Sequence, residues 1–169
     1  IGVYLAPEWV QRFRASYPQL TVALQTGVTA SIIADVAEQR LEIGFIEGEL
    51  DSAAHAEMIV LELQKIEQHV VVGAKHPFWE RQSLPLEALN GKSMIVRQPT
   101  SQSRIWLDRA LQQHGISVSI DAEFDNLESM KRSVAMGTCL AIMPPYVVQN
   151  EIEQGTLRML PIVGAPLTR

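Results

Sequence analysis

The sequence contains a single cysteine, Cys139, and this scarcity excludes two kinds of structure. One cysteine cannot form an internal disulfide or a cysteine-based zinc site. The four histidines do not have the spacing of a metal site, so we expect no metal and no other cofactor. Cys139 lies in the apolar run TCLAIM, which predicts a small buried residue. The alternative, a redox sensor, requires an exposed thiol with a low pKa.

The sequence also lacks a cluster of lysine and arginine, and its net charge is -5. Direct DNA binding by this segment is therefore disfavoured, because a nucleic-acid-binding domain usually presents a basic face. No apolar run approaches the roughly 20 residues that a membrane helix needs. The first residues, IGVYLAPEWV, lack the basic start of a signal peptide, which favours a cytoplasmic protein without membrane contact. They also lack an initial methionine, which indicates a piece of a longer protein.

Apolar residues make up 47% of the 169 residues, as is typical of a packed globular protein. Helical and extended patterns alternate along the chain, which favours an α/β fold with a parallel sheet and covering helices. Apolar residues at helical spacing predict helices at 6–18, 32–40, 86–89, 105–115, 125–137 and 145–155. Runs of β-branched and other apolar residues predict extended segments at 20–26, 42–48, 58–64, 67–74, 93–96, 118–124, 139–144 and 156–163.

Several helix ends carry a recognisable signal. Thr29 or Ser31 is expected to cap the helix at 32–40. Asp125 with Glu128 fits a capping box for the helix at 125–137, and Asn126 is a second candidate for its cap. Gly115 is expected to close the helix at 105–115.

The segment RQPTSQSR, residues 97–104, is rich in hydrogen-bond donors and lies where a predicted strand leads into a predicted helix. Ligands of open α/β sheets bind at the carboxyl ends of strands, and the amino end of a helix favours an anion. Arg104 lies in the first helical turn, where its charge opposes the helix dipole, so a nearby ligand anion would stabilise it. The alternative is that Thr100 or Ser101 is only a helix cap, but one hydroxyl would suffice for that role.

Five pieces of the sequence, in this order, resemble the effector-binding domain of LysR-type transcriptional regulators. They are PEWVQRFRASYPQLTVALQTG, QRLEIGFIEG, IVRQPTSQSR, FDNLESMKRSVAMGTCLAIMP and GTLRMLPI. The resemblance runs from about Gly2 to the carboxyl end. It is strongest to the branch that contains regulators of carbon fixation and sulfur assimilation.

The resemblance implies two Rossmann-like α/β lobes, as in type II periplasmic binding proteins, joined by two crossover segments. Lobe I would comprise residues 1–64 and 147–169, and lobe II residues 65–146. The family binds DNA through an amino-terminal winged helix-turn-helix that is absent from this sequence, and it forms homodimers and homotetramers. The family domain also opens with a strand before the position of Ile1 and continues past Arg169, so lobe I would lack a central strand here.

The resemblance further implies that a small effector, a carboxylate, sulfate-like or phosphorylated metabolite, binds between the lobes. The residues that match the family's effector site are Arg97, Thr100, Ser101, Gln102, Ser103 and Met143 in lobe II, and Val28, Thr29, Ile46 and Glu47 in lobe I. Arg97 could face either the ligand or the solvent.

Two other functions are compatible with such a fold. A solute-binding protein of a transporter shares the two lobes, and the residues upstream of Ile1 would separate the two functions. A small α/β enzyme is disfavoured, because neither G-x-S-x-G nor H-E-x-x-H occurs and no acid–base pair is visible. We therefore expect a non-enzymatic sensor.

Overall fold

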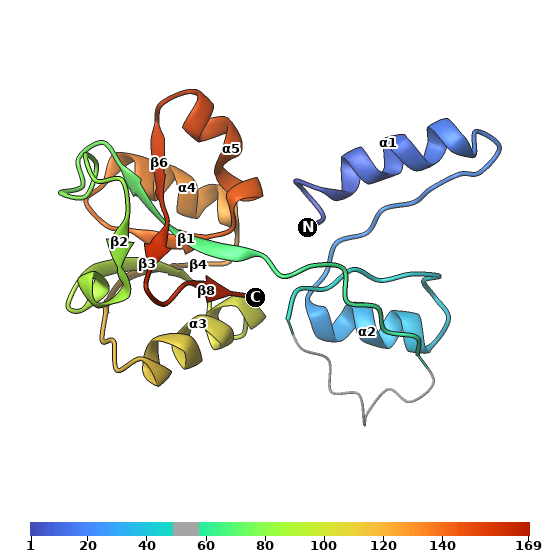
Figure 1. The fold of residues 1–169 in the computed structure, drawn as a ribbon. Coiled ribbons are helices and arrows are strands. Elements are labelled where there is room, and N and C mark those ends of the chain that lie inside the picture. Colours follow the sequence, from blue (N-terminus) through green and yellow to red (C-terminus); the bar gives the residue numbers. More distant parts are fainter. Residues whose placement is uncertain (49–57) are drawn as a thin grey trace. The chain divides into compact units, whose positions relative to one another are not determined.

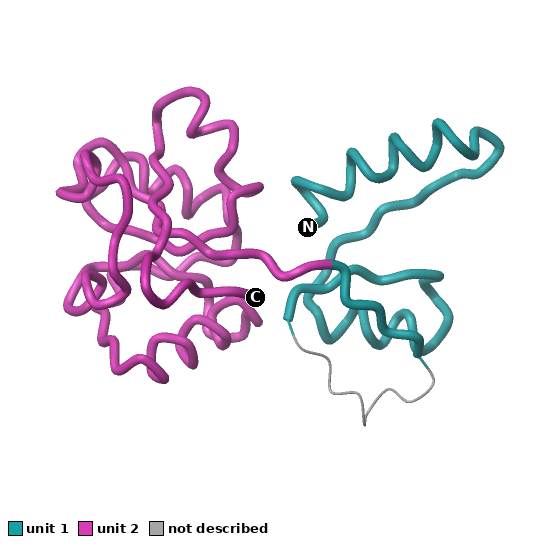
Figure 2. Tube along the Cα trace, viewed as in Figure 1, with its two compact units in different colours: residues 1–63 teal, residues 64–169 magenta. Residues whose placement is uncertain are grey.

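The computed structural model describes residues 1–48 and 58–169 (Figure 1). The chain divides into two compact units, unit 1 at Ile1–Leu63 and unit 2 at Gln64–Arg169 (Figure 2). None of the helices in the described part of the chain is long and apolar enough to span a membrane.

The described residues of unit 1 form two helices. Helix α1 (Ala6–Ser16) has a proline in its first turn, where the missing N–H costs nothing, and it ends before Pro18 as expected. Helix α2 (Thr29–Ala37) begins three residues earlier than predicted. Neither expected cap forms: Val28 is the N-cap residue, and the Ser31 hydroxyl donates to the Val28 carbonyl over 2.9 Å.

The extended segments 20–26, 42–48 and 58–63 of unit 1 are not part of any strand among the described residues. The expectation of strands there was wrong for this structure, because an extended segment becomes a strand only when a neighbour completes the hydrogen-bond ladder. Segment 42–48 packs on helix α2 instead: a Cβ on Gly44 would lie 2.7 Å from the Ile32 side chain.

Unit 2 is built around strand β1 (Glu67–Gly73), which is almost completely buried. Strand β1 pairs antiparallel with β5 (Ala141–Met143), β6 (Leu157–Leu160) and β8 (Leu167–Thr168). Residues 147–169, expected in lobe I, therefore lie in unit 2, because their strands complete the sheet around β1.

The predicted parallel sheet is present only in part. Strand β3 (Ser93–Arg97) pairs parallel with β4 (Ser119–Phe124), and short β2 (Leu84–Pro85) pairs parallel with β7 (Ile162–Val163). A parallel bridge also joins Met94 to Leu140. The strands around β1 run antiparallel, a direction that the apolar content of these segments does not encode.

The helices of unit 2 lie close to their predicted positions. They are η2 (Leu86–Leu89), α3 (Gln102–Gln113), α4 (Leu127–Met136) and α5 (Pro145–Glu153). The Asn126 carboxamide accepts a hydrogen bond from the Ser129 N–H over 2.8 Å and so caps α4. This confirms the prediction that Asn126 caps the helix, and it excludes the capping box with Asp125. Gly115 follows α3 with a φ of 66°, a conformation that favours glycine.

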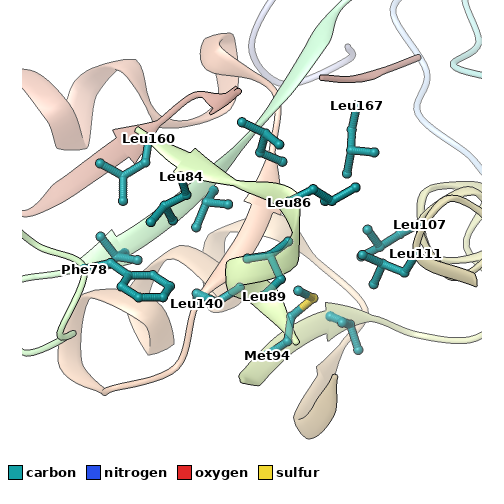
Figure 3. Packing of buried hydrophobic residues seen from close by; sticks show 14 residues of the cluster. Phe78, Leu84, Leu86, Leu89, Met94, Leu107, Leu111, Leu140, Leu160 and Leu167 are labelled. Atoms are coloured by element: carbon teal, nitrogen blue, oxygen red, sulfur yellow. The ribbon is translucent and has the colours of Figure 1, made fainter. Parts of the chain in front are cut away.

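The hydrophobic core of unit 2 lies between the strands, helix η2 and helix α3 (Figure 3). Leu84, Leu89, Met94 and Leu140 have no exposed surface. Burial of apolar side chains contributes about 1.5–3 kcal/mol each. This core holds the carboxyl end of β3 and the amino end of α3 in fixed positions.

Candidate functional site

The β3–α3 junction (residues 97–103) is the candidate site in unit 2. Buried Met94, Ile95 and Val96 hold strand β3 in the core, and the strand ends at Arg97. The Gln98 N–H donates to the Phe124 carbonyl over 2.9 Å, and the Ser101 N–H donates to the Gln98 carbonyl over 3.0 Å. These bonds fix the turn between strand and helix.

Ser101 is the N-cap residue of helix α3, but its hydroxyl makes no cap hydrogen bond. Only its carbonyl takes part, accepting from the N–H groups of Arg104 and Ile105 over 3.0 Å each. The first N–H groups of a helix have no intrahelical acceptor, so this end of α3 favours an anion. The proposal that Thr100 or Ser101 is a simple side-chain cap is therefore wrong, and Thr100 and Gln102 are exposed beside the helix start.

Ser103 has a partner that sequence reasoning missed. Its hydroxyl accepts a hydrogen bond from Arg169 Nη1 over 2.8 Å. The backbone of Arg169 in turn pairs with Ile66, just before β1, through bonds of 2.7 and 3.0 Å. No sequence signal points to this contact, because 66 residues separate the two side chains.

Arg97 is half-buried, and its Nη2 donates to the Asp125 carbonyl over 2.6 Å, at the start of α4. Its Nε is buried without a hydrogen-bond partner in the described part of the chain. The guanidinium of Arg97 therefore lies beside the carbonyl of Asp125, shortly before helix α4 begins.

Arg104 is not available to a ligand anion. The residue is 8% exposed, and its guanidinium pairs with the carboxylates of Asp108 and Glu123 at 2.9 and 2.8 Å. The inference that its charge supports an acidic ligand was wrong, because two side chains of the protein already neutralise it.

The remaining predicted site residues lie elsewhere. Met143 is fully buried in β5, with His69 as its partner in the strand register, so its side chain offers no surface to a ligand. In unit 1, Val28 and Thr29 form the start of α2, and Val28 is 63% exposed. Ile46 and Glu47 are half-buried in the segment after α2, and a Glu47 carboxylate oxygen lies 3.5 Å from the Ile1 nitrogen.

Cys139 is buried, and its thiol donates to the Asp121 carboxylate over 3.2 Å. Burial, together with the hydrogen bond and charge of Asp121, raises the pKa of Cys139 to about 11. The prediction of a buried core cysteine is confirmed, and the low-pKa thiol of a redox sensor is absent at this position. Among residues 1–48 and 58–169, no group of three or more His, Cys, Asp or Glu side chains could hold a metal ion.

The raised pKa of Cys139 predicts slow alkylation. Near pH 8 we expect iodoacetamide to react with the folded protein about 100-fold more slowly than with the same chain in urea, because only the thiolate reacts. The rate should continue to rise up to about pH 11. Mass spectrometry of quenched samples measures both rates, and equal rates in folded and unfolded chains would contradict the Asp121 contact.

A protein-family model for the LysR substrate binding domain matches residues 1–169. The "Uncharacterized HTH-type transcriptional regulator YeiE" of Escherichia coli (strain K12) is 30% identical over 169 residues, which is 100% of this chain and 55% of that protein. A "Probable RuBisCO transcriptional regulator" of Cyanophora paradoxa is 27% identical over 99% of this chain and 53% of that protein. The chain thus spans about half the length of the curated relatives that it matches.

Solved structures agree with these matches. The effector binding domain of QuiR in complex with shikimate superposes with a TM-score of 0.79 and 25% identity, covering 99% of this chain and 78% of that chain. The Synechocystis PCC6803 CcmR regulatory domain in complex with 2-PG superposes with a TM-score of 0.81 and 21% identity, covering 98% and 78%. The second likeness shows the fold, which is the expected α/β fold of periplasmic-binding-protein type.

Proposed function

The chain belongs to the LysR substrate-binding domain family, and from this premise we propose that it is the effector-sensing domain of a transcriptional regulator. The observation that supports this function is the β3–α3 junction. There, the hydroxyl of Ser101 is not used as a helix cap, and Thr100 and Gln102 are exposed beside it. Hydroxyl, amide and helix N–H groups together suit an anionic group of a small metabolite.

The relatives that match the chain are regulators of transcription, which favours this function over that of a transporter's solute-binding protein. We propose that DNA is bound by a part of the protein outside this chain and that the domain catalyses no reaction. We further propose that it acts in the cytoplasm as a dimer or tetramer.

In this proposal the effector changes the balance between conformations of the protein. A ligand can shift such a balance only by the difference between its affinities for the two states. In unit 2 we propose Arg97, Thr100, Ser101, Gln102 and Ser103 as the residues that bind the effector. In unit 1, taken by itself, we propose a role in effector binding for Val28, Thr29, Ile46 and Glu47. Met143 would support the site from the core rather than contact the ligand.

Replacing both Thr100 and Ser101 by alanine is expected to abolish effector binding without unfolding the protein, because both side chains lie outside the core. A thermal-shift screen with sulfate, phosphate, shikimate and 2-PG provides the measurement. A ligand that binds only the folded state stabilises it by about 2.7 kcal/mol at a hundredfold excess over its dissociation constant. We expect a dose-dependent rise in melting temperature that disappears in the double variant.

The matched control removes two hydroxyls from the other end of the same strand pair. Ser93 and Ser119 are exposed register partners at the amino ends of β3 and β4, so their double alanine variant should keep the full ligand shift. An undiminished shift in the Thr100/Ser101 variant would exclude the junction as the site. Absence of a shift from all four probes in the unmodified protein would exclude these ligand classes.

A further inference from the structure

The position of Arg104 requires an explanation beyond ligand binding. It is the third residue of helix α3 and is 8% exposed. A cation in the first turn of a helix is disfavoured by the helix dipole, and burial removes its hydration. A charged side chain keeps such a position only when other groups of the protein stabilise it.

Four hydrogen bonds surround the Arg104 guanidinium. Its Nε donates to both carboxylate oxygens of Asp108, one turn further along α3, over 2.9 Å each. Its Nη1 donates to Glu123 Oε1 over 2.8 Å and to the Arg97 carbonyl over 3.0 Å. One side chain therefore connects the end of strand β3, strand β4 and the first two turns of helix α3.

The charge of Arg104 is maintained within this network. Burial opposes the charge, but the hydrogen bonds and charges of Glu123 and Asp108 hold the pKa of Arg104 above its ordinary value. The bonds are directed along the planar fork of the guanidinium. A lysine ammonium is a single point charge and cannot reach all three partners in this geometry.

We propose that Arg104 is the positioning residue of the β3–α3 junction, and this inference rests on the proposed effector site there. It fixes the Arg97 carbonyl at one end of the junction and the first turn of α3 at the other. The intervening residues, which include Thr100 and Ser101, are thereby held in the conformation that binds the effector. A preordered loop loses less conformational entropy when a ligand binds, so its affinity is higher.

The test compares Arg104→Lys with Arg109→Lys, which changes an exposed arginine on the same helix in the same way. Amide hydrogen exchange is measured for peptides that cover residues 97–103 and for peptides that cover β1. In Arg104→Lys we expect exchange at least about 10-fold faster in the junction, with the β1 peptides unchanged. A general loss of stability would instead accelerate both regions. Arg109→Lys should match the unmodified protein.

A second variant, Glu123→Gln, tests the same network in case Arg104→Lys does not fold. It keeps a hydrogen-bond acceptor at a half-exposed position but removes one charge from the network. We expect it to accelerate exchange in residues 97–103 by a smaller factor than Arg104→Lys. Junction exchange equal to that of the unmodified protein in both variants overturns the proposal.

The binding measurement uses whichever of sulfate, phosphate, shikimate or 2-PG raises the melting temperature of the unmodified protein. We expect Arg104→Lys to lower the affinity for that probe about 10-fold or more, and Arg109→Lys to leave the affinity unchanged. Faster junction exchange with unaltered affinity would overturn the positioning role. Failure of every probe would exclude these ligand classes for the proposed effector site, whereas the exchange measurement tests the Arg104 network without a ligand.

Discussion

Replacing Lys131 by methionine is expected to lower the free energy of unfolding by about 3–5 kcal/mol, because it leaves a carboxylate without its counter-ion. Lys131 is 4% exposed on helix α4. Its ammonium lies 2.7 Å from the Glu151 carboxylate on α5 and 2.8 Å from that of Glu128, and it donates to the Val147 carbonyl. Urea unfolding followed by circular dichroism measures the change.

The pH dependence of this contribution follows from the direction of the pKa shift. Burial disfavours the charge of Lys131, but hydrogen bonds and charges of Glu128 and Glu151 outweigh burial and raise its pKa. For a raised pKa, the stabilisation is fully present below the ordinary pKa of lysine and is lost as the pH rises through the raised value. The effect of Lys131→Met should therefore be constant near neutral pH and shrink in strong alkali.

Two controls distinguish the effect of breaking the buried ion pair from the effect of losing any lysine. Lys75→Met changes an exposed lysine of unit 2 and should alter stability by less than about 0.5 kcal/mol. Combining Lys131→Met with Glu151→Leu removes both charges, and a buried ion pair replaced by apolar side chains is often neutral. If the double variant were as unstable as Lys131→Met alone, the unpaired carboxylate would not be the cause.

Replacing Leu140 by alanine is expected to cost about 2–5 kcal/mol, because the cavity that it leaves cannot close completely. Leu140 has no exposed surface and packs in the core shown in Figure 3. Its backbone is also fixed, donating to the Ser93 carbonyl over 3.1 Å and accepting from the Ile95 N–H over 2.8 Å. Because β3 carries the junction, the same urea titration should show the junction lost together with the core.

The control for Leu140 is Met136→Ala, at the end of helix α4. Met136 is 68% exposed, and alanine is a good helix former, so stability should change by less than about 0.5 kcal/mol. A cost below about 1 kcal/mol for Leu140→Ala would show that the core around β3 and β5 tolerates a cavity, contrary to the packing described.

Local signals predicted the helices well. Helix α1 follows from its apolar spacing and from Pro7 and Pro18, and the start of α4 follows from Asn126, whose side chain reaches an N–H three residues away. These elements depend on neighbours within one or two turns. The strands of unit 1 could not be predicted in this way, since a strand depends on a hydrogen-bonding neighbour that its own residues do not specify.

The candidate site likewise has features that local sequence predicted and features that depend on distant residues. Residues 97–104 were identified by their polar content between a strand and a helix, and by resemblance to a family. The interaction partners of these residues were not predicted. Asp108 and Glu123 form ion pairs with Arg104, where a ligand anion was expected, and Arg169 donates a hydrogen bond to Ser103. Met143 was assigned to the site by position, but its side chain is in the core.

By itself the sequence determined the family, the α/β class, most helix positions and the place of the polar junction, since each depends on local order and spacing. Only the tertiary structure decided the antiparallel pairing around β1, the placement of residues 147–169 in unit 2, and the neutralisation of Arg104. These features depend on contacts between residues far apart in the chain. Such contacts form where burial and charge are satisfied together, and no local pattern encodes them.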